Sequence, residues 1–209
     1  MLKYRYQGKF APEKLAQDNI DRLSTGLIRP NLKILELGCA NGFMTRYFRE
    51  KLGCQVVSVD INPETKPEIV GDLNRPEVWQ SIKKQAPFDV VFASAILEHL
   101  PQPEITLQLI KAVLKPKGEL IVTLPNISHW RQRLERLLGR FEYEDFGQLD
   151  RTHLRFFNYY SAKKLIRDAG FKIKKVLLDP AGGIKYFNWL IKPWPNLYAY
   201  QICIYATKR

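Results

Sequence analysis

The feature that most restricts the fold of this chain is an alternation of apolar and amphipathic segments between residues 32 and 125. Runs of apolar and β-branched residues predict strands, and the segments between them have helical periodicity or end in turns. The predicted strands cover residues 32–37, 55–60, 68–70, 88–93 and 119–124, and the predicted helices cover residues 41–52, 77–85 and 104–114. Strands that alternate with helices of about ten residues indicate βαβ units and a mainly parallel sheet.

The alternation is interrupted after Pro125 and resumes near residue 161. Residues 129–139 predict a basic helix, and residues 140–160 are aromatic and polar without a clear period. Ser161 is the predicted N-cap of a further helix that ends before Gly170. The last two predicted strands cover residues 171–178 and 200–207. We therefore expect one α/β domain over residues 1–209, with seven mainly parallel strands and an antiparallel last strand. This domain is also expected to contain a helical segment at about 10–29 and an insertion on the acceptor side at about 126–159.

Composition excludes several classes of protein. The 209 residues are 45% hydrophobic, which argues against a disordered chain. No apolar run approaches the roughly 20 residues that cross a bilayer, and the first ten residues have no apolar core of a secretory signal. Three cysteines far apart predict no disulfide framework, so a cytoplasmic location is expected. A net charge of +12 is compatible with nucleic acid, with peripheral membrane contact, or with a lysine-rich enzyme surface.

The segment ILELGCANG, residues 34–42, leads from a predicted strand through a tight turn into a helix. Gly38 and Gly42 allow a sharp turn against which a ligand can lie. A dinucleotide site would need G-x-G-x-x-G, but Ala40 and Phe43 occupy the second and third glycine positions. Glu36 at the mouth would repel a pyrophosphate by roughly 4 kcal/mol per charge pair at about 4 Å. The loop therefore favours a ligand with a cationic group and no phosphate.

This loop resembles motif I, (D/E)-x-G-x-G-x-G, of class I S-adenosyl-L-methionine (SAM)-dependent methyltransferases, with Ala40 as the middle glycine. FDVVFA, ILEHL and VLKPKGEL, at residues 88–93, 96–100 and 113–120, resemble later motifs of that family. The resemblance implies a Rossmann-like three-layer sandwich with SAM as cofactor. Asp60, 18 residues after Gly42, would accept the ribose hydroxyls, as an acid does in dinucleotide folds. The implied cofactor-binding residues are Glu36, Gly38, Cys39, Ala40, Asn41, Gly42, Asp60, Ile61, Asp72, Leu73 and Ala93.

The segment LDRTHLRFF, residues 149–157, resembles small bacterial methyltransferases of the methyltransferase-11/12/23 type. The resemblance implies that His153 lies near the acceptor, with Arg151 or Arg155 holding an anionic group. A structural clasp, with Asp150 paired to an arginine and His153 bonded to a backbone carbonyl, explains the same composition equally well. His99, after the fourth strand, is a second catalytic candidate. The three histidines have no short mutual spacing, so no metal site is predicted.

The sequence thus predicts a SAM-dependent methyltransferase with catalytic candidates His153 and His99 and a small-molecule, glycan or lipid-linked acceptor. One alternative is a nucleic-acid methyltransferase that uses the basic stripe of Arg133, Arg136 and Arg140. A solvated helix face is the favoured explanation of that stripe, because Glu135 interrupts it. Another is a SAM-binding regulatory module without catalysis. A dehydrogenase is disfavoured by Glu36 and by the missing glycines.

Overall fold

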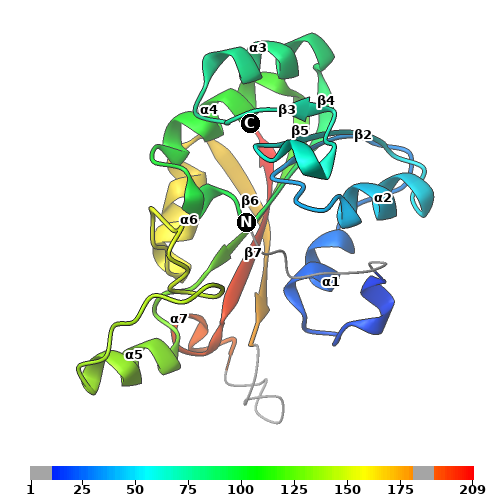
Figure 1. Ribbon diagram of the computed structural model, residues 1–209. Coiled ribbons are helices and arrows are strands. Elements are labelled where there is room, and N and C mark those ends of the chain that lie inside the picture. Colours follow the sequence, from blue (N-terminus) through cyan, green and yellow to red (C-terminus); the bar gives the residue numbers. More distant parts are fainter. Residues whose placement is uncertain (1–10, 181–190) are drawn as a thin grey trace.

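The computed structural model describes residues 11–180 and 191–209. Their centre is one sheet of seven strands in the order β3-β2-β1-β4-β5-β7-β6 (Figure 1). The strands are β1 (Lys33–Leu37), β2 (Gln55–Asp60), β3 (Ile69–Val70), β4 (Phe88–Ser94), β5 (Leu114–Pro125), β6 (Phe171–Asp179) and β7 (Gln201–Lys208). The helices are α1 (Ile20–Thr25), α2 (Phe43–Glu50), α3 (Pro76–Gln85), α4 (Pro103–Val113), α5 (Trp130–Leu137), α6 (Tyr159–Asp168) and α7 (Pro195–Tyr198), with short 3-10 helices at Pro12–Lys14, Pro63–Thr65 and Leu97–His99.

The helices cover both faces of the sheet, which makes three layers. One apolar cluster joins α3, α4 and α6 to the sheet through side chains such as Trp79, Leu107 and Ile166. A second cluster lies on the opposite face, where Ile20 of α1 and Phe48 of α2 pack. Figure 1 shows the two groups of helices on opposite sides of the strands. Because both faces are covered, the central strands are continuous apolar runs, as their sequences predict.

The strand order along the sheet reverses between β1 and β4, which are neighbours and run parallel to each other. Leu37 at the end of β1 lies opposite Val59 of β2 and opposite Ala93 of β4. The segments that follow these three strands therefore leave the sheet at the same edge. In open α/β sheets, ligands bind at the carboxyl ends of the strands where the strand order reverses. This topology positions the loop at residues 38–42 for ligand binding.

The predicted fold class is confirmed: the sheet is mainly parallel, and β7 runs antiparallel to both neighbours. The alternation of residues 200–207 suits an edge strand as well as an antiparallel one, but β7 lies between β5 and β6. Residues 115–118, which separate the predicted helix at 104–114 from the predicted strand at 119–124, fall inside β5 because pairing with β4 continues on either side of them. Phe88 lies opposite Leu114, and Val90 lies opposite Glu119. The intervening residues bulge out, with Lys117 at φ +60°.

The predicted N-cap Ser161 is wrong by one turn. Asn158 caps α6, and its side chain accepts hydrogen bonds from the backbone N–H groups of Tyr160 and Ser161. The Ser161 hydroxyl accepts in return from the Asn158 backbone N–H, at 2.9 Å, which completes a capping box. Ser161 therefore stabilises the helix start from its third position.

Two further predicted segments contain the following elements. The expected helical segment at 10–29 contains one 3-10 turn and α1; residue 10, like the rest of the chain's first ten residues, lies outside the described part. The expected insertion at 126–159 contains α5, which stands away from the sheet in Figure 1. Within the described ranges, no helix combines the length and apolarity needed to cross a bilayer.

Candidate active site

The loop after β1 is a tight turn built on three left-handed residues. Gly38, Ala40 and Gly42 have φ values of +71°, +47° and +67°. The Gly42 N–H donates to the Cys39 carbonyl at 2.8 Å, and the Gly38 N–H donates to the Val59 carbonyl at 2.8 Å. A Cβ on Gly38 would lie 2.9 Å from the Ile96 side chain. The alternating backbone explains why the motif prefers glycine at all three positions, and Ala40 accepts a strained conformation there.

Asp60 connects this loop to the end of β2. One carboxylate oxygen accepts from the Ala40 N–H at 2.8 Å, and the other accepts from the Asn62 N–H at 2.9 Å. A carboxylate oxygen has two lone pairs, so both oxygens retain capacity for a further donor. The next residue, Ile61, is 58% exposed although it is apolar. An acceptor group beside an exposed apolar side chain suits a ribose with an attached base.

The remaining predicted cofactor residues lie around the same edge. Asp72 follows β3 and accepts from the Asn74 backbone and side-chain amides at 2.9 and 2.8 Å. Leu73 is buried, and its carbonyl accepts from the Trp79 indole at 2.8 Å. Ala93 is fully buried near the end of β4.

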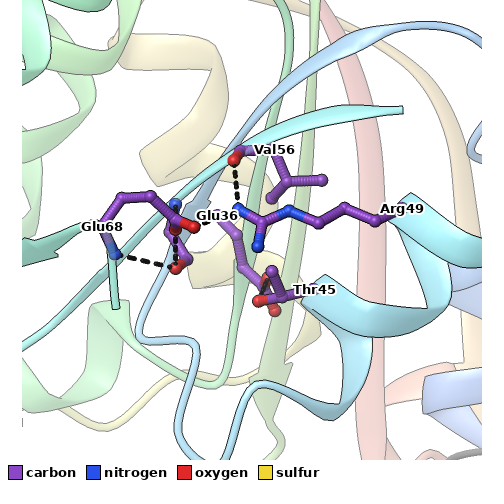
Figure 2. Close-up of polar contacts among 6 residues, drawn as sticks. Glu36, Thr45, Arg49, Val56 and Glu68 are labelled. Atoms are coloured by element: carbon purple, nitrogen blue, oxygen red, sulfur yellow. Dashed lines mark hydrogen bonds and ion pairs between the residues drawn. The ribbon is translucent and has the colours of Figure 1, made fainter. Parts of the chain in front are cut away.

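Glu36 is buried and is not open at the mouth of the loop, where the sequence argument expected it. Its side chain is 3% exposed and accepts a hydrogen bond from the Thr45 hydroxyl of α2. Figure 2 shows it beneath α2, in one polar cluster with Arg49 and Glu68. Arg49 also donates to the Val56 carbonyl at 2.6 Å and forms an ion pair with Glu68. This cluster ties α2 to β1, β2 and the residue before β3.

The surroundings of Glu36 remove the charge on which the electrostatic argument depended. Burial raises the pKa of its carboxyl group to about 8, against the lowering effects of the Thr45 hydrogen bond and the Arg49 charge. The folded chain therefore holds this group mainly neutral at pH 7. Selection of a cationic ligand by Glu36 has no support in this geometry, and its side chain serves the anchoring of α2.

The residues present nonetheless fit the nucleoside part of SAM. Asp60 supplies acceptors for ribose hydroxyls, Ile61 supplies an apolar surface for the base, and the loop at 38–42 allows close backbone approach. These groups follow adjacent strands whose ends are in register. This fit depends on the shape of the loop at 38–42 and on hydrogen bonding by Asp60, and it does not depend on a charge at Glu36.

A cavity of about 560 Å³ lies beyond this edge, at the ends of β4 and β5. Its wall combines residues from both strand ends, from the predicted insertion and from the start of β7: Ala95, Glu98, His99, Pro125, Phe146, Gly147, Asp150, His153, Tyr200 and Gln201. Ile96, which packs against Gly38, lies between two of these residues in the chain. The cavity therefore adjoins the segment that supports the glycine loop, and its size suits a small molecule.

The two predicted catalytic residues meet in this cavity. The rings of His99 and His153 lie 4.8 Å apart between centroids, edge to face, although 54 residues separate them in the chain. The Nδ1 of His99 lies 3.2 Å from the Thr152 carbonyl oxygen, and the Nδ1 of His153 lies 3.4 Å from the Gln148 carbonyl oxygen. Burial lowers the pKa of both imidazoles, and the charge of His99 lowers that of His153 further. Both rings are therefore mainly neutral at pH 7.

Glu98 is a site residue that sequence reasoning missed. It is 1% exposed, yet it lines the cavity, and neither carboxyl oxygen has a hydrogen-bond partner among the described residues. Burial raises the pKa of this carboxyl to about 8, and the Asp150 charge adds to the rise. The only sequence signal was its place before His99 in the ILEHL motif.

The predicted substrate-binding arginines do not line this cavity. Arg151 is exposed and forms an ion pair with Asp145 at 3.0 Å. Arg155 donates through Nε and Nη2 to the Pro101 carbonyl, at 2.9 and 2.6 Å. Asp150 accepts from the Thr152 backbone and hydroxyl, and it forms no ion pair with an arginine of residues 11–180 and 191–209. The geometry gives Arg155 a structural role as a clasp, and it does not place either guanidinium on an acceptor.

The basic helix α5 is capped by His129, whose Nδ1 accepts from the Arg131 N–H at 3.4 Å. Several of its arginine donors are directed to the chain itself. Arg133 bonds the Ser128 carbonyl and Arg136 bonds the Gln132 carbonyl, at 2.8 and 2.7 Å. These contacts are typical of a solvated helix face and do not favour nucleic-acid binding.

Comparison with protein families agrees with this geometry. Residues 5–176 match the family described as a methyltransferase domain. This match covers the glycine loop, the Asp60 region and the wall of the His99–His153 cavity except for Tyr200 and Gln201.

Curated relatives are similar at a lower level. The ubiquinone biosynthesis O-methyltransferase of Xanthomonas euvesicatoria pv. vesicatoria is 27% identical over 117 residues, which cover 51% of this chain and 48% of that protein. The mitochondrial ubiquinone biosynthesis O-methyltransferase of Rattus norvegicus is 26% identical over 88% of this chain and 60% of its own length. The chain thus spans about half the length of the first relative.

Solved structures show the same fold at low identity. A SAM-dependent methyltransferase from Archaeoglobus fulgidus superimposes with a TM-score of 0.62 and 18% identity, over 90% of each chain. A SAM-dependent methyltransferase from Methanosarcina mazei superimposes with a TM-score of 0.61 and 16% identity, over 89% of this chain and 96% of that one. The [4+2]-cyclase SpnF superimposes with a TM-score of 0.58 and 16% identity, over 90% of this chain and 81% of that one.

Proposed function

The chain belongs to the methyltransferase-domain family, and from that premise we propose that it methylates a hydroxyl oxygen of a small molecule held in the cavity of His99 and His153. The family match confirms the predicted class I methyltransferase and its cofactor SAM. The observation that carries the proposal is the convergence of the two histidines on one cavity beside the glycine-loop edge. The similarity to O-methyltransferases supports oxygen as the target atom.

The cofactor half of the site is proposed as follows. Asp60 accepts the ribose hydroxyls, Ile61 covers one face of the base, and Asp72 with the Leu73 backbone meets its polar edge. The backbone of residues 38–42 and the end of β4 at Ala93 complete the cradle. When bound, SAM supplies a methyl group on a cationic sulfur, which a nucleophile displaces in line.

The acceptor half limits the chemistry of the substrate. Phe146, Pro125 and Tyr200 give the cavity apolar and aromatic walls, and Glu98 with Asp150 gives it acidic groups. Such a wall favours an acceptor with an apolar or aromatic body and a neutral hydroxyl over a polyanion. A volume of about 560 Å³ encloses a small molecule or the reactive end of a larger one.

His99 and His153 are proposed to activate that hydroxyl. Holding an acceptor and a methyl group in near-attack geometry supplies about 7–11 kcal/mol of the barrier. Removal of the hydroxyl proton is the remaining requirement, and positioned groups contribute about 10²–10⁴-fold to such steps. The histidines are the side chains with neutral imidazoles at the cavity wall.

The test uses single His99→Ala and His153→Ala variants of the full chain, with labelled SAM and a panel of phenols, catechols and hydroxylated lipids. We expect turnover at saturating SAM to fall by about 10²-fold or more, with SAM affinity unchanged by calorimetry. Arg151→Ala, on the outer surface, serves as the control and should keep its turnover. Full turnover in both histidine variants, or methylation confined to non-hydroxyl acceptors, would overturn the proposal.

A further inference from the structure

We propose that Glu98, His99 and His153 bind one divalent transition-metal cation in the wall of the acceptor cavity. Each residue offers one ligand atom, and these atoms all lie within 4.8 Å of one another. The residues come from the 3-10 turn after β4 and from the segment before α6, so no spacing rule in the sequence brings them together. The absence of short spacing between histidines argued against a metal site, and the fold supplies the proximity instead.

Glu98 is the first observation that points to a ligand. Its side chain is 1% exposed, and both carboxyl oxygens lack a hydrogen-bond partner among the described residues. It also forms no ion pair within residues 11–180 and 191–209. A buried carboxyl group without partners costs free energy in either protonation state, and buried charges are normally paired or bound to metals. A cation beside Glu98 gives its carboxylate a partner.

The histidines are oriented as metal ligands usually are. The Nδ1 atoms of His99 and His153 face the backbone carbonyls of Thr152 and Gln148, so each ring donates its Nδ1–H there. This leaves each Nε2 with its lone pair available. Metal-ligating histidines almost always donate their other ring nitrogen to a carbonyl or carboxylate, which fixes the tautomer. Asp150 supports this arrangement because it holds Thr152 through a 2.6 Å hydrogen bond.

The donor set selects the class of cation. Two imidazole nitrogens and one carboxylate suit Zn²⁺, Mn²⁺, Fe²⁺ or Co²⁺, whereas Mg²⁺ and Ca²⁺ prefer all-oxygen sites. Around a tetrahedral zinc ion with bonds of about 2.0–2.2 Å, ligand atoms lie roughly 3.3–3.6 Å apart. Side-chain rotations that bring the three groups closer by about an ångström are therefore required. The open side of the site faces the cavity, which leaves positions for water or for an acceptor oxygen.

The role of the cation rests on the proposed function. An acceptor hydroxyl bound to it becomes more acidic, as metal-bound water does. The hydroxyl proton leaves to solvent through the cavity mouth, and the oxygen lone pair forms the new O–CH₃ bond. The S–CH₃ bond of the sulfonium donor breaks with its electron pair remaining on sulfur, so charge and atoms balance. His99 and His153 then act on the hydroxyl through the cation.

Cation binding is measured on the full chain without SAM or acceptor. Chelator-treated protein is dialysed against Zn²⁺, Mn²⁺, Co²⁺ or Mg²⁺, and bound metal is counted by mass spectrometry. We expect one Zn²⁺ or Co²⁺ per chain, visible absorption bands from bound Co²⁺, and Mg²⁺ affinity lower by about 100-fold. At a concentration about 100 times Kd, the cation should raise Tm by about 5–10 °C.

Glu98→Gln and His153→Gln are the diagnostic variants, and Glu77→Gln on the exposed face of α3 is the matched control. Both diagnostic variants should lose at least about 100-fold in Zn²⁺ affinity and should lose the Co²⁺ bands. Glu98→Gln replaces an unpaired buried acid by a neutral side chain of equal size, so its metal-free Tm should not fall. Wild-type binding no tighter than that of folded Glu98→Gln overturns the proposal.

A second measurement separates this proposal from the proposed function. If metal-free protein transfers methyl groups to oxygen at the full rate, the proposed role of the cation is wrong and the proposed hydroxyl methyltransferase activity stands. If each chain binds one cation but no methyl group is transferred to any hydroxyl, the cation site is confirmed and the proposed function is wrong.

Discussion

The backbone N–H of Ala40 donates to a carboxylate oxygen of Asp60 at 2.8 Å, which joins the glycine loop after β1 to the residue that ends β2. The same carboxylate is the proposed acceptor for the ribose hydroxyls. Loop shape and cofactor affinity therefore depend on one side chain.

We predict that Asp60→Asn weakens binding of S-adenosylhomocysteine by about 10- to 150-fold, the cost of losing a charge-assisted hydrogen bond of about 1.5–3 kcal/mol. The amide nitrogen of asparagine would face a backbone N–H, either that of Ala40 or that of Asn62, so the loop also loses order. Calorimetric titration measures the affinity. Asp72→Asn on the neighbouring loop is the comparison, with a smaller expected loss, and equal affinity of Asp60→Asn and wild type would contradict the assignment.

Substitution of Ala40 by glycine should leave stability nearly unchanged, whereas a β-branched residue should lower it, because φ at this position is +47°. In Ala40→Gly, relief of left-handed strain offsets the greater freedom of the unfolded chain, so stability should stay within about 1 kcal/mol of wild type. Ala40→Val should lose about 1–3 kcal/mol. Denaturant unfolding gives both values, and similar stability of the two variants would argue against a strained loop.

Glu36→Gln should gain stability relative to wild type as the pH rises. The carboxyl pKa is about 8 in the folded chain and near 4.5 when unperturbed. Between these values the folded chain holds a proton that the unfolded chain has released, so the contribution of Glu36 to stability falls as pH rises from about 5 to 8. Gln does not titrate and its oxygen still accepts from Thr45. The variant should therefore gain about 2–4 kcal/mol over this window.

Urea unfolding of both proteins at pH 5, 6, 7 and 8 measures this difference. Glu77→Gln, an exposed position in α3, is the control and should track wild type. A difference between Glu36→Gln and wild type that stays constant with pH would mean that Glu36 is not held neutral.

Asn158→Ala should destabilise the chain by about 1 kcal/mol, because it removes the cap of α6. Ser161→Ala removes the reciprocal bond of the capping box and should cost less. Thermal unfolding of the two variants ranks them. A larger loss for Ser161→Ala would restore Ser161 as the principal cap.

The strands and the glycine loop were predictable because their determinants are local. Buried parallel strands need continuous apolar runs, and a left-handed turn needs glycine or a small residue, so residues 34–42 and 88–93 carry their own signal. Ser161 was misplaced by one turn because Asn158 and Ser161 are both good caps and only the backbone path distinguishes them. β7 was ambiguous because alternation does not tell an edge strand from an interior one.

The side-chain environments were not predictable because they depend on distant contacts. Glu36 is held inward by the Thr45 hydroxyl of α2, which donates to its carboxyl group, and the charge of Arg49 acts on the same group. The histidines meet because the backbone N–H groups of Leu154 and Arg155 both donate to the Glu98 carbonyl, at 2.9 and 3.0 Å. Neither relationship is encoded in spacing along the chain.

The two hydrogen bonds from the Leu154 and Arg155 backbone to the Glu98 carbonyl have an evolutionary consequence. The proposed SAM site is assembled from the loops after β1, β2 and β3 and from the end of β4, whereas Phe146, Gly147, Asp150 and His153 reach the proposed acceptor cavity from one continuous stretch of chain. On this proposal, replacement of that stretch alone would change the acceptor while the methyl donor stayed the same, provided that the substitute still offered two amide groups to the Glu98 carbonyl.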